Sequence, residues 1–298
     1  MDDTQRRFYE LLGDRYPMLS GGVEEARLVA PDLVDRYFEE CLRWVTVSFG
    51  DDALAKVVDG YAFFTMEVNR AQQIYELAGR YQISTFAEAN ALFYQQPEYM
   101  RDYYWGVFAI LFCWPHYVEL MDFYLDRFVR GLKGGRLVEI APGHGAWGVL
   151  AVTGVSGLTL EGWDISPTSL EIAPRMAAGA GVGDRCVYRV ADATKIDPGR
   201  DRFDAGVCCF TLEHLEQPGD FLAGFAPSMK SGATAFVTLA LTAAQTDHIY
   251  EFTHESEAII MAERAGFELL ECRVARPQRR LPNARYVPRV QAMILKRQ

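Results

Sequence analysis

The letters RLVEIAPGHGAW, residues 136–147, constrain the fold more than any other stretch of the chain. The apolar residues of 137–140 predict a buried strand, with the acid Glu139 inside it. Gly143 and Gly145 then predict a tight turn, where a backbone without Cβ atoms can approach a ligand closely. The apolar run that follows predicts a helix whose N-terminus faces this turn. Such a turn alone fits an ordinary strand-to-helix connection equally well.

Three further apolar segments also predict strands, and each is followed by an acidic residue. Residues 158–162 lead to Asp164, roughly 20 residues beyond the glycine turn, where doubly wound sheets commonly hold an acid that binds ribose hydroxyls. Residues 186–190 lead to Asp192, and residues 203–210 lead to the letters TLEHL. Helical patterns alternate with these segments, for example at 168–178 and 218–229, which predicts parallel βαβ units.

The motifs EIAPGHG, WDIS, ADA and FDAGVCCFTLEHL, in this order, resemble those of the class I S-adenosylmethionine (SAM)-dependent methyltransferase family. The resemblance runs from about Leu137 to the C-terminus. It implies an α/β fold with a doubly wound seven-stranded sheet over residues 133–298, in which the last strand is antiparallel. It also implies SAM as the cofactor.

Residues 1–132 predict an all-α lid domain in front of that sheet, because their apolar positions follow the helical i, i+3, i+4 rhythm. A long helix is expected from Asp51 and Asp52 to about Gly79. A second helix starts near Pro97 and is apolar on nearly all sides, so it should be enclosed. Pro115 interrupts it, and another helix is expected from Tyr117 to Leu132.

The resemblance assigns a part of the cofactor to each motif. The turn at Gly143 and Gly145 would lie at the amino acid end of SAM. Asp164 would accept hydrogen bonds from both ribose hydroxyls, and Ile165 would pack on the adenine. The family often has glycine where this chain has Ala141, and we expect the methyl group to be accommodated with a negative φ.

The other motif residues have one ligand-binding and one structural interpretation each. Asp192 would accept from the adenine amino group beside the amide of Ala193, or it would cap a helix. The backbone of Cys209 and Phe210 would face the methionine portion. Glu139 resembles the acid that orders the site through water or backbone contacts, although it could simply brace the loop.

Catalytic residues are harder to predict, because methyl transfer from a sulfonium mainly requires positioning and exclusion of water. We name His116, Trp114 and Tyr104 as candidates. Trp114 and His116 flank a proline at a helix break, and an aromatic residue such as Tyr104 could hold the sulfonium by cation–π attraction. Each of them also fits an ordinary core position. His214, in the EHL letters, is expected to be structural.

Cysteine spacing and net charge limit the partners. The six cysteines show no CxxC spacing, so neither a disulfide framework nor a metal site is predicted. A net charge of −10 argues against nucleic acid. Residues 273–298 nevertheless carry eight basic residues and no acid, which leaves −18 on the rest. This basic segment could dock an acidic carrier or oligonucleotide, but pairing with the acidic remainder of the chain is the preferred interpretation.

The remaining expectations concern location and assembly. The N-terminus has no signal pattern, and the apolar run at 103–114 is too short to span a membrane, so a cytoplasmic protein is predicted. The lid helices are candidates for a homodimer contact.

Three functions fit these observations. The first is methyl transfer to an enclosed small molecule of secondary metabolism, at a nitrogen, oxygen or carbon atom. The second is cyclisation of SAM itself, which gives azetidine-2-carboxylate and methylthioadenosine. The third is a non-catalytic SAM-binding scaffold. The first two differ in whether an acceptor pocket lies beside the methyl group.

Overall fold

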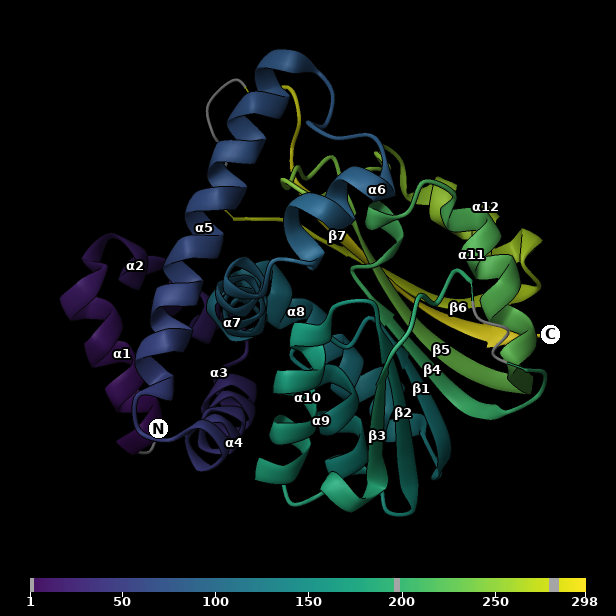
Figure 1. Cartoon of the computed structure of the whole chain (residues 1–298), viewed down its shortest axis with the longest axis horizontal. Coiled ribbons are helices and arrows are strands. Elements are labelled where there is room, and N and C mark those ends of the chain that lie inside the picture. Colours follow the sequence, from purple (N-terminus) through teal and green to yellow (C-terminus); the bar gives the residue numbers. More distant parts are fainter. Residues whose placement is uncertain (1–2, 196–198, 279–283) are drawn as a thin grey trace.

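The computed structural model describes residues 3–195, 199–278 and 284–298. Its centre is a seven-stranded sheet in the order β3-β2-β1-β4-β5-β7-β6 (Figure 1). The strands are β1 (Gly135–Ile140), β2 (Leu158–Asp164), β3 (Cys186–Val190), β4 (Phe203–Cys209), β5 (Met229–Leu241), β6 (Phe267–Ala275) and β7 (Arg289–Arg297). Strands β1 to β5 pair in parallel, and β7 is antiparallel to both β5 and β6. The predicted fold class is confirmed.

Helices cover both faces of the sheet (Figure 1). On one face lie α9 (Ala146–Gly154) and α10 (Pro167–Gly179), and on the other lie α11 (Pro218–Phe225) and α12 (Glu255–Arg264). The helix expected over 218–229 ends early, at Phe225. A 3-10 turn over Ala226–Ser228 follows it, and β5 already begins at Met229. Pro227 lies in this turn and has no backbone N–H to continue an α-helix.

The region before β1 is helical, as predicted. Its helices are α1 (Asp3–Arg15), α2 (Pro17–Val29), α3 (Pro31–Leu33), η1 (Val34–Phe38), α4 (Glu39–Phe49), α5 (Ala53–Ala78), α6 (Phe86–Ala89), η2 (Asn90–Tyr94), α7 (Pro97–Cys113), α8 (Pro115–Phe123), η3 (Tyr124–Phe128) and η4 (Val129–Gly131). The break at Pro115 is confirmed, but α8 begins at the proline itself, where its missing N–H costs nothing. Helix α2 was not predicted from the sequence, because Gly21 and Gly22 interrupt its apolar pattern.

The N-terminal helices lie against the sheet domain on the side of α9 and α10 (Figure 1). Buried residues of α4, α5, α7 and α8 form one hydrophobic cluster with residues of α9, α10, β1 and β5. The far side of the sheet, under α11 and α12, has a separate cluster. The proposed division at residues 132 and 133 remains a prediction, because the two parts share core.

The basic C-terminal segment pairs within the chain, as preferred above. Arg289 bonds to Glu255, Lys296 Nζ lies 3.8 Å from Glu268 Oε2, and Arg285 Nε lies 3.9 Å from Glu76 Oε2. Arg279 and Arg280 lie outside the described residues. Within the described ranges, no helix combines the length and the apolar character that a membrane crossing needs.

Candidate functional site: a cavity at the carboxyl edge of the sheet

A cavity of about 440 Å³ lies at the carboxyl ends of β1, β2 and β4, beneath helices α5, α7 and α8. This volume is in the usual range for small-molecule sites. Every sequence motif contributes to its lining. The candidates that line it are Tyr104, Trp114, His116, Gly143, Asp164, Ile165, Asp192, Ala193, Cys209 and Phe210.

Asp164 holds the glycine turn in place. Its side chain is 4% exposed, and its two carboxylate oxygens accept hydrogen bonds from the amides of Gly143 and Ser166, each at 2.9 Å. Burial raises the pKa of Asp164, and these two amides act in the opposite direction. The side-chain hydroxyls of Ser169 and Tyr104 also hydrogen-bond to this carboxylate and lower its pKa. Asp164 lines the cavity, and the ribose contact stays a prediction.

Gly143 is required at its position. Its φ is 53°, and a Cβ there would meet Cε1 of Tyr104 at 2.9 Å. The Tyr104 ring therefore lies directly over the turn. Tyr104 was proposed as catalytic, but this contact places it at the predicted cofactor turn.

The expectation for Ala141 was wrong. Its φ is +53°, in the left-handed region, and not negative. Phe210 (φ 51°) and Thr242 (φ 47°) are also left-handed. These three residues follow β1, β4 and β5, so non-glycine backbone strain is concentrated where those strands end at the cavity.

Glu139 and Gly145 were expected to contact the cofactor, but among the described residues neither lines the cavity. Glu139 is buried behind the turn, where its Oε1 accepts from the Gly148 amide of α9 at 3.2 Å, and burial raises its pKa well above the ordinary value. Gly145 has a φ of 79°, and a Cβ there would meet that of Ala173 at 2.9 Å. Glu139 therefore braces the helix after the turn. Because Gly145 has no Cβ, α10 can pack closely against the turn.

Asp192 lines the cavity and also orders the turn that follows it. Its Oδ1 accepts from the Thr194 amide at 3.0 Å and from the Thr194 hydroxyl at 2.6 Å. Lys195 Nζ lies 2.8 Å from Oδ2. Burial acts to raise the pKa of Asp192, but these partners outweigh burial and lower it. The described residues 193–195 form a turn, which Asp192 holds through these contacts.

A ladder of aromatic rings connects the lid to the end of β4. Trp114 stacks on His116 with ring centroids 5.6 Å apart. The edge of His116 meets Tyr117 at 4.9 Å, and Tyr117 stacks on Phe210 at 5.1 Å. All four rings line the cavity. The His116 ring is buried and its Nδ1 has no hydrogen-bond partner, and burial lowers its pKa to about 3.

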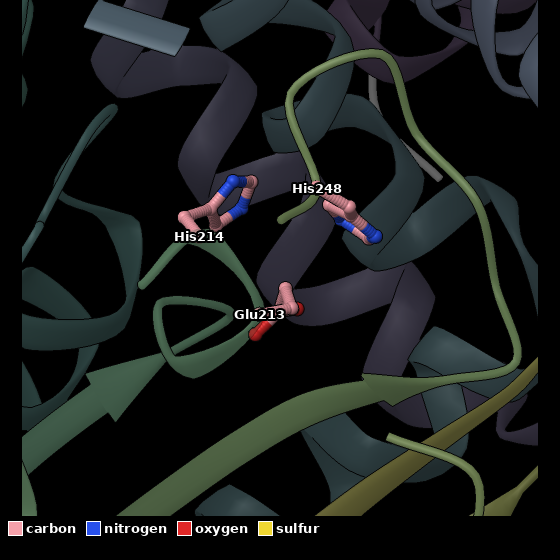
Figure 2. A group of neighbouring side chains, drawn as sticks. All are labelled: Glu213, His214 and His248. Carbon is pink, nitrogen blue, oxygen red and sulfur yellow. The ribbon is translucent and has the colours of Figure 1, made fainter. Parts of the chain in front are cut away.

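A second polar group in the cavity was not recognised from the sequence. Glu213, His214, Asp247 and His248, here called the acid–histidine cluster, all line it. Figure 2 shows both imidazole rings on the same side of the Glu213 carboxylate. Glu213 and His214 belong to the 3-10 turn η6 (Leu212–His214) after β4, and the other two lie in the loop after β5. Burial raises the pKa of Glu213 to about 7, against the influence of His214.

This cluster left a weak signal in the sequence. The letters TLEHL and QTDHIY each follow a strand, and β4 and β5 are neighbours in the sheet. Two acid–histidine segments at the ends of adjacent parallel strands must come close together, but the order of the strands has to be known first.

Comparison with known proteins agrees with this architecture. Residues 137–232, about a third of the chain, match the family model described as a methyltransferase domain. No curated protein has a significantly similar sequence.

Among solved structures, the chain is similar to the [4+2]-cyclase SpnF, with 17% identity, a TM-score of 0.50, and coverage of 61% of this chain and 80% of that one. It is also similar to phosphoethanolamine N-methyltransferase 2 of Haemonchus contortus, solved with SAM, with 13% identity, a TM-score of 0.52, and coverage of 72% and 60%. It is similar to geranyl diphosphate methyltransferase as well, with 14% identity, a TM-score of 0.50, and coverage of 60% of this chain and 85% of that one. At these identities the likeness shows the fold.

The matched family model and the order of the seven strands lead to one conclusion. The chain carries a methyltransferase domain, matched over residues 137–232, within a seven-stranded α/β fold.

Proposed function

We propose that the protein transfers the methyl group of SAM to a small molecule enclosed between the sheet and the N-terminal helices. The observation that carries this proposal is the extent of the cavity beyond the cofactor motifs. Its lining continues along Asn69 and Gln72 of α5 to Ala243 and Gln245 of the loop after β5. Cyclisation of SAM alone would not need this additional space.

Two residues that line the cavity, Gln245 and His116, carry polar atoms suited to an acceptor. The side-chain Nε2 of Gln245 and the Nδ1 of His116 are buried without hydrogen-bond partners. Buried polar atoms usually have partners, because leaving one unpaired costs about 1–3 kcal/mol. A bound acceptor with one hydrogen-bond acceptor and one donor would satisfy both.

The residues present fit SAM at the predicted place. Gly143 lines the cavity beside the Tyr104 ring, and Asp164 and Asp192 present carboxylates at adjacent strand ends. The rings of Trp114, Tyr117 and Phe210 surround the region next to the end of β4, where a sulfonium would be stabilised by cation–π attraction. When bound, SAM supplies an electrophilic methyl group.

The chain's own contribution to the reaction is positioning. The aromatic ladder excludes water, and Gln245 and His116 orient the acceptor in line with the methyl group. With its pKa lowered to about 3, His116 is neutral at pH 7, so its Nδ1 can accept a hydrogen bond from the acceptor. It therefore acts by orientation more than as a strong base.

The test is a product analysis of the purified protein. We expect S-adenosylhomocysteine to form only when SAM is supplied together with a metabolite extract. Methylthioadenosine and azetidine-2-carboxylate from SAM alone would establish the cyclisation alternative. Binding of SAM without any product, over a broad range of extracts, would favour the non-catalytic scaffold.

A further inference from the structure

The acid–histidine cluster has the spacing of a metal site. Glu213, His214 and His248 each offer one ligand atom, and these atoms lie within 4.8 Å of one another (Figure 2). In a zinc site the bonds to imidazole nitrogen and carboxylate oxygen are about 2.0–2.2 Å long. Small side-chain rotations can therefore bring the three atoms onto one ion.

The hydrogen bonds of both imidazoles involve Nδ1. His248 Nδ1 lies 2.8 Å from the carbonyl oxygen of Ala243, and His214 Nδ1 lies 3.2 Å from that of Asp247. A carbonyl oxygen can only accept, so His248 Nδ1 carries the proton and its Nε2 keeps a lone pair. His214 Nδ1 also lies 3.0 Å from the Tyr94 hydroxyl, and its Nε2 keeps a lone pair when Nδ1 donates to the Asp247 carbonyl. Histidines that bind metals are typically held in this way, with the second ring nitrogen donating to a carbonyl or carboxylate.

The cluster also contains buried carboxyl oxygens that lack hydrogen-bond partners. Glu213 and Asp247 are both fully buried. Glu213 Oε2 and both carboxylate oxygens of Asp247 have no well-formed hydrogen bond, since His214 Nδ1 approaches Asp247 Oδ2 only to 3.4 Å. Buried carboxylates are costly unless they are paired or coordinate a cation.

The backbone holds the two segments of the cluster together. The amides of Ile249 and Tyr250 both donate to the carbonyl oxygen of Glu213, at 2.8 and 2.9 Å. The Glu213 side chain is fixed at its other oxygen, where Oε1 accepts from the Ala240 amide at 3.1 Å. These bonds fix the backbone and one carboxylate oxygen of Glu213, while Oε2 has no hydrogen-bond partner.

We propose that Glu213, His214 and His248 bind one divalent first-row transition metal ion of the Zn²⁺ type, with Asp247 beside it and an open coordination position toward the cavity. Two histidines and one carboxylate are an established ligand set for catalytic zinc and need no cysteine. The lack of CxxC spacing in the sequence therefore does not speak against this site.

The position of the site suggests what the ion would hold. Glu213 lies three residues after Phe210, at the end of β4 where the reactive part of SAM is expected. An oxygen of the acceptor, from a carboxylate or an enolate, could fill the open position and be oriented there by the ion. This role rests on the proposed function, whereas binding of the ion does not.

The test uses the full-length protein, first stripped with a chelator. Zn²⁺ is titrated in competition with a chromogenic chelator, and Co²⁺ is added separately to record its visible absorption. We expect one ion per chain and a Co²⁺ spectrum typical of mixed nitrogen and oxygen ligands. His248→Ala should weaken binding by about a hundred-fold or more, and the more conservative His248→Gln should also weaken it.

The matched control is His254→Ala, because His254 caps α12 and does not line the cavity. It should bind Zn²⁺ like the unchanged protein. SAM binding by each variant verifies that it has folded. Absence of stoichiometric binding in the unchanged protein, or equal binding by folded His248→Ala, would overturn the site and leave a purely hydrogen-bonded cluster. Metal binding without any methylated product would contradict only the proposed function.

Discussion

The ring of Tyr117 on α8 stacks on the ring of Phe210 at the end of β4, with centroids 5.1 Å apart and planes inclined by 25°. This contact joins the N-terminal helices to the strand end that is predicted to face the methionine portion of SAM. It makes the helical part of the chain a wall of the cofactor cavity, since both rings line it.

The first prediction concerns this stack. Tyr117→Leu should raise the KM for SAM about ten-fold, because cation–π attraction of a desolvated cation is worth roughly 1–2 kcal/mol. Tyr117→Phe keeps the ring and should stay within about two-fold of the unchanged protein. Steady-state kinetics of both variants provide the measurement. Equal KM values for the leucine and phenylalanine variants would show that the ring does not contact the cofactor.

The second prediction contrasts two left-handed positions in the turn after β1. Gly143→Ala should abolish detectable SAM binding by calorimetry, because its Cβ would collide with Tyr104 at 2.9 Å and φ is 53°. Ala141→Gly should instead raise the free energy of unfolding by about 1 kcal/mol, since glycine relieves the left-handed strain. Urea denaturation measures this change. A destabilised Ala141→Gly variant would argue against the positive φ.

The third prediction concerns the second strand. Asp164→Asn should weaken SAM binding by at least about ten-fold, since the amide nitrogen cannot accept the hydrogen bond that a carboxylate oxygen accepts. The control is Asp184→Asn, because Asp184 is exposed on the 3-10 turn η5 (Gly183–Arg185), away from the cavity. Calorimetric titration with SAM compares the two. Similar affinities would remove Asp164 from the cofactor site.

The fourth prediction concerns pH. Burial lowers the pKa of His116 from 6.5 to about 3, so the folded protein holds this ring neutral while the unfolded chain takes up a proton. The resulting stability is fully present above pH 6.5 and is lost as the pH falls toward 3. Between pH 7 and pH 5 this loss amounts to about 2 kcal/mol.

His116→Phe should therefore reduce the loss of unfolding free energy between pH 7 and pH 5 by about 2 kcal/mol. Urea denaturation at both values, for both proteins, is the measurement. His144, whose pKa burial also lowers to about 3, should leave part of the pH dependence in the variant. An unchanged pH dependence would mean that His116 is hydrated and protonates in the folded state.

The strands of the sheet could be predicted from the sequence because each strand carries a local signal. The apolar residues of 137–140 with the glycine turn after them identify β1, and acids mark the ends of β2 and β3. Local signals cannot report what a side chain touches. For this reason Glu139 and Gly145 were assigned to the cofactor, although they pack against α9 and α10.

The acid–histidine cluster was missed because local sequence signals do not show which distant residues come together. His214 was interpreted as structural, and His248 was not singled out from the sequence. Their proximity depends on β4 and β5 being neighbours and on the amides of Ile249 and Tyr250 binding the Glu213 carbonyl. Those contacts join residues 36 and 37 positions apart, beyond the reach of helix or strand periodicity.

The most direct test of the account follows the methyl group itself. The protein is incubated with SAM that carries a deuterated methyl group, in the presence of a metabolite extract, and all products are analysed by mass spectrometry. The account predicts that the label leaves SAM and appears on one small metabolite, with S-adenosylhomocysteine as the unlabelled co-product. Label that stays on methylthioadenosine, with no labelled metabolite, would contradict methyl transfer.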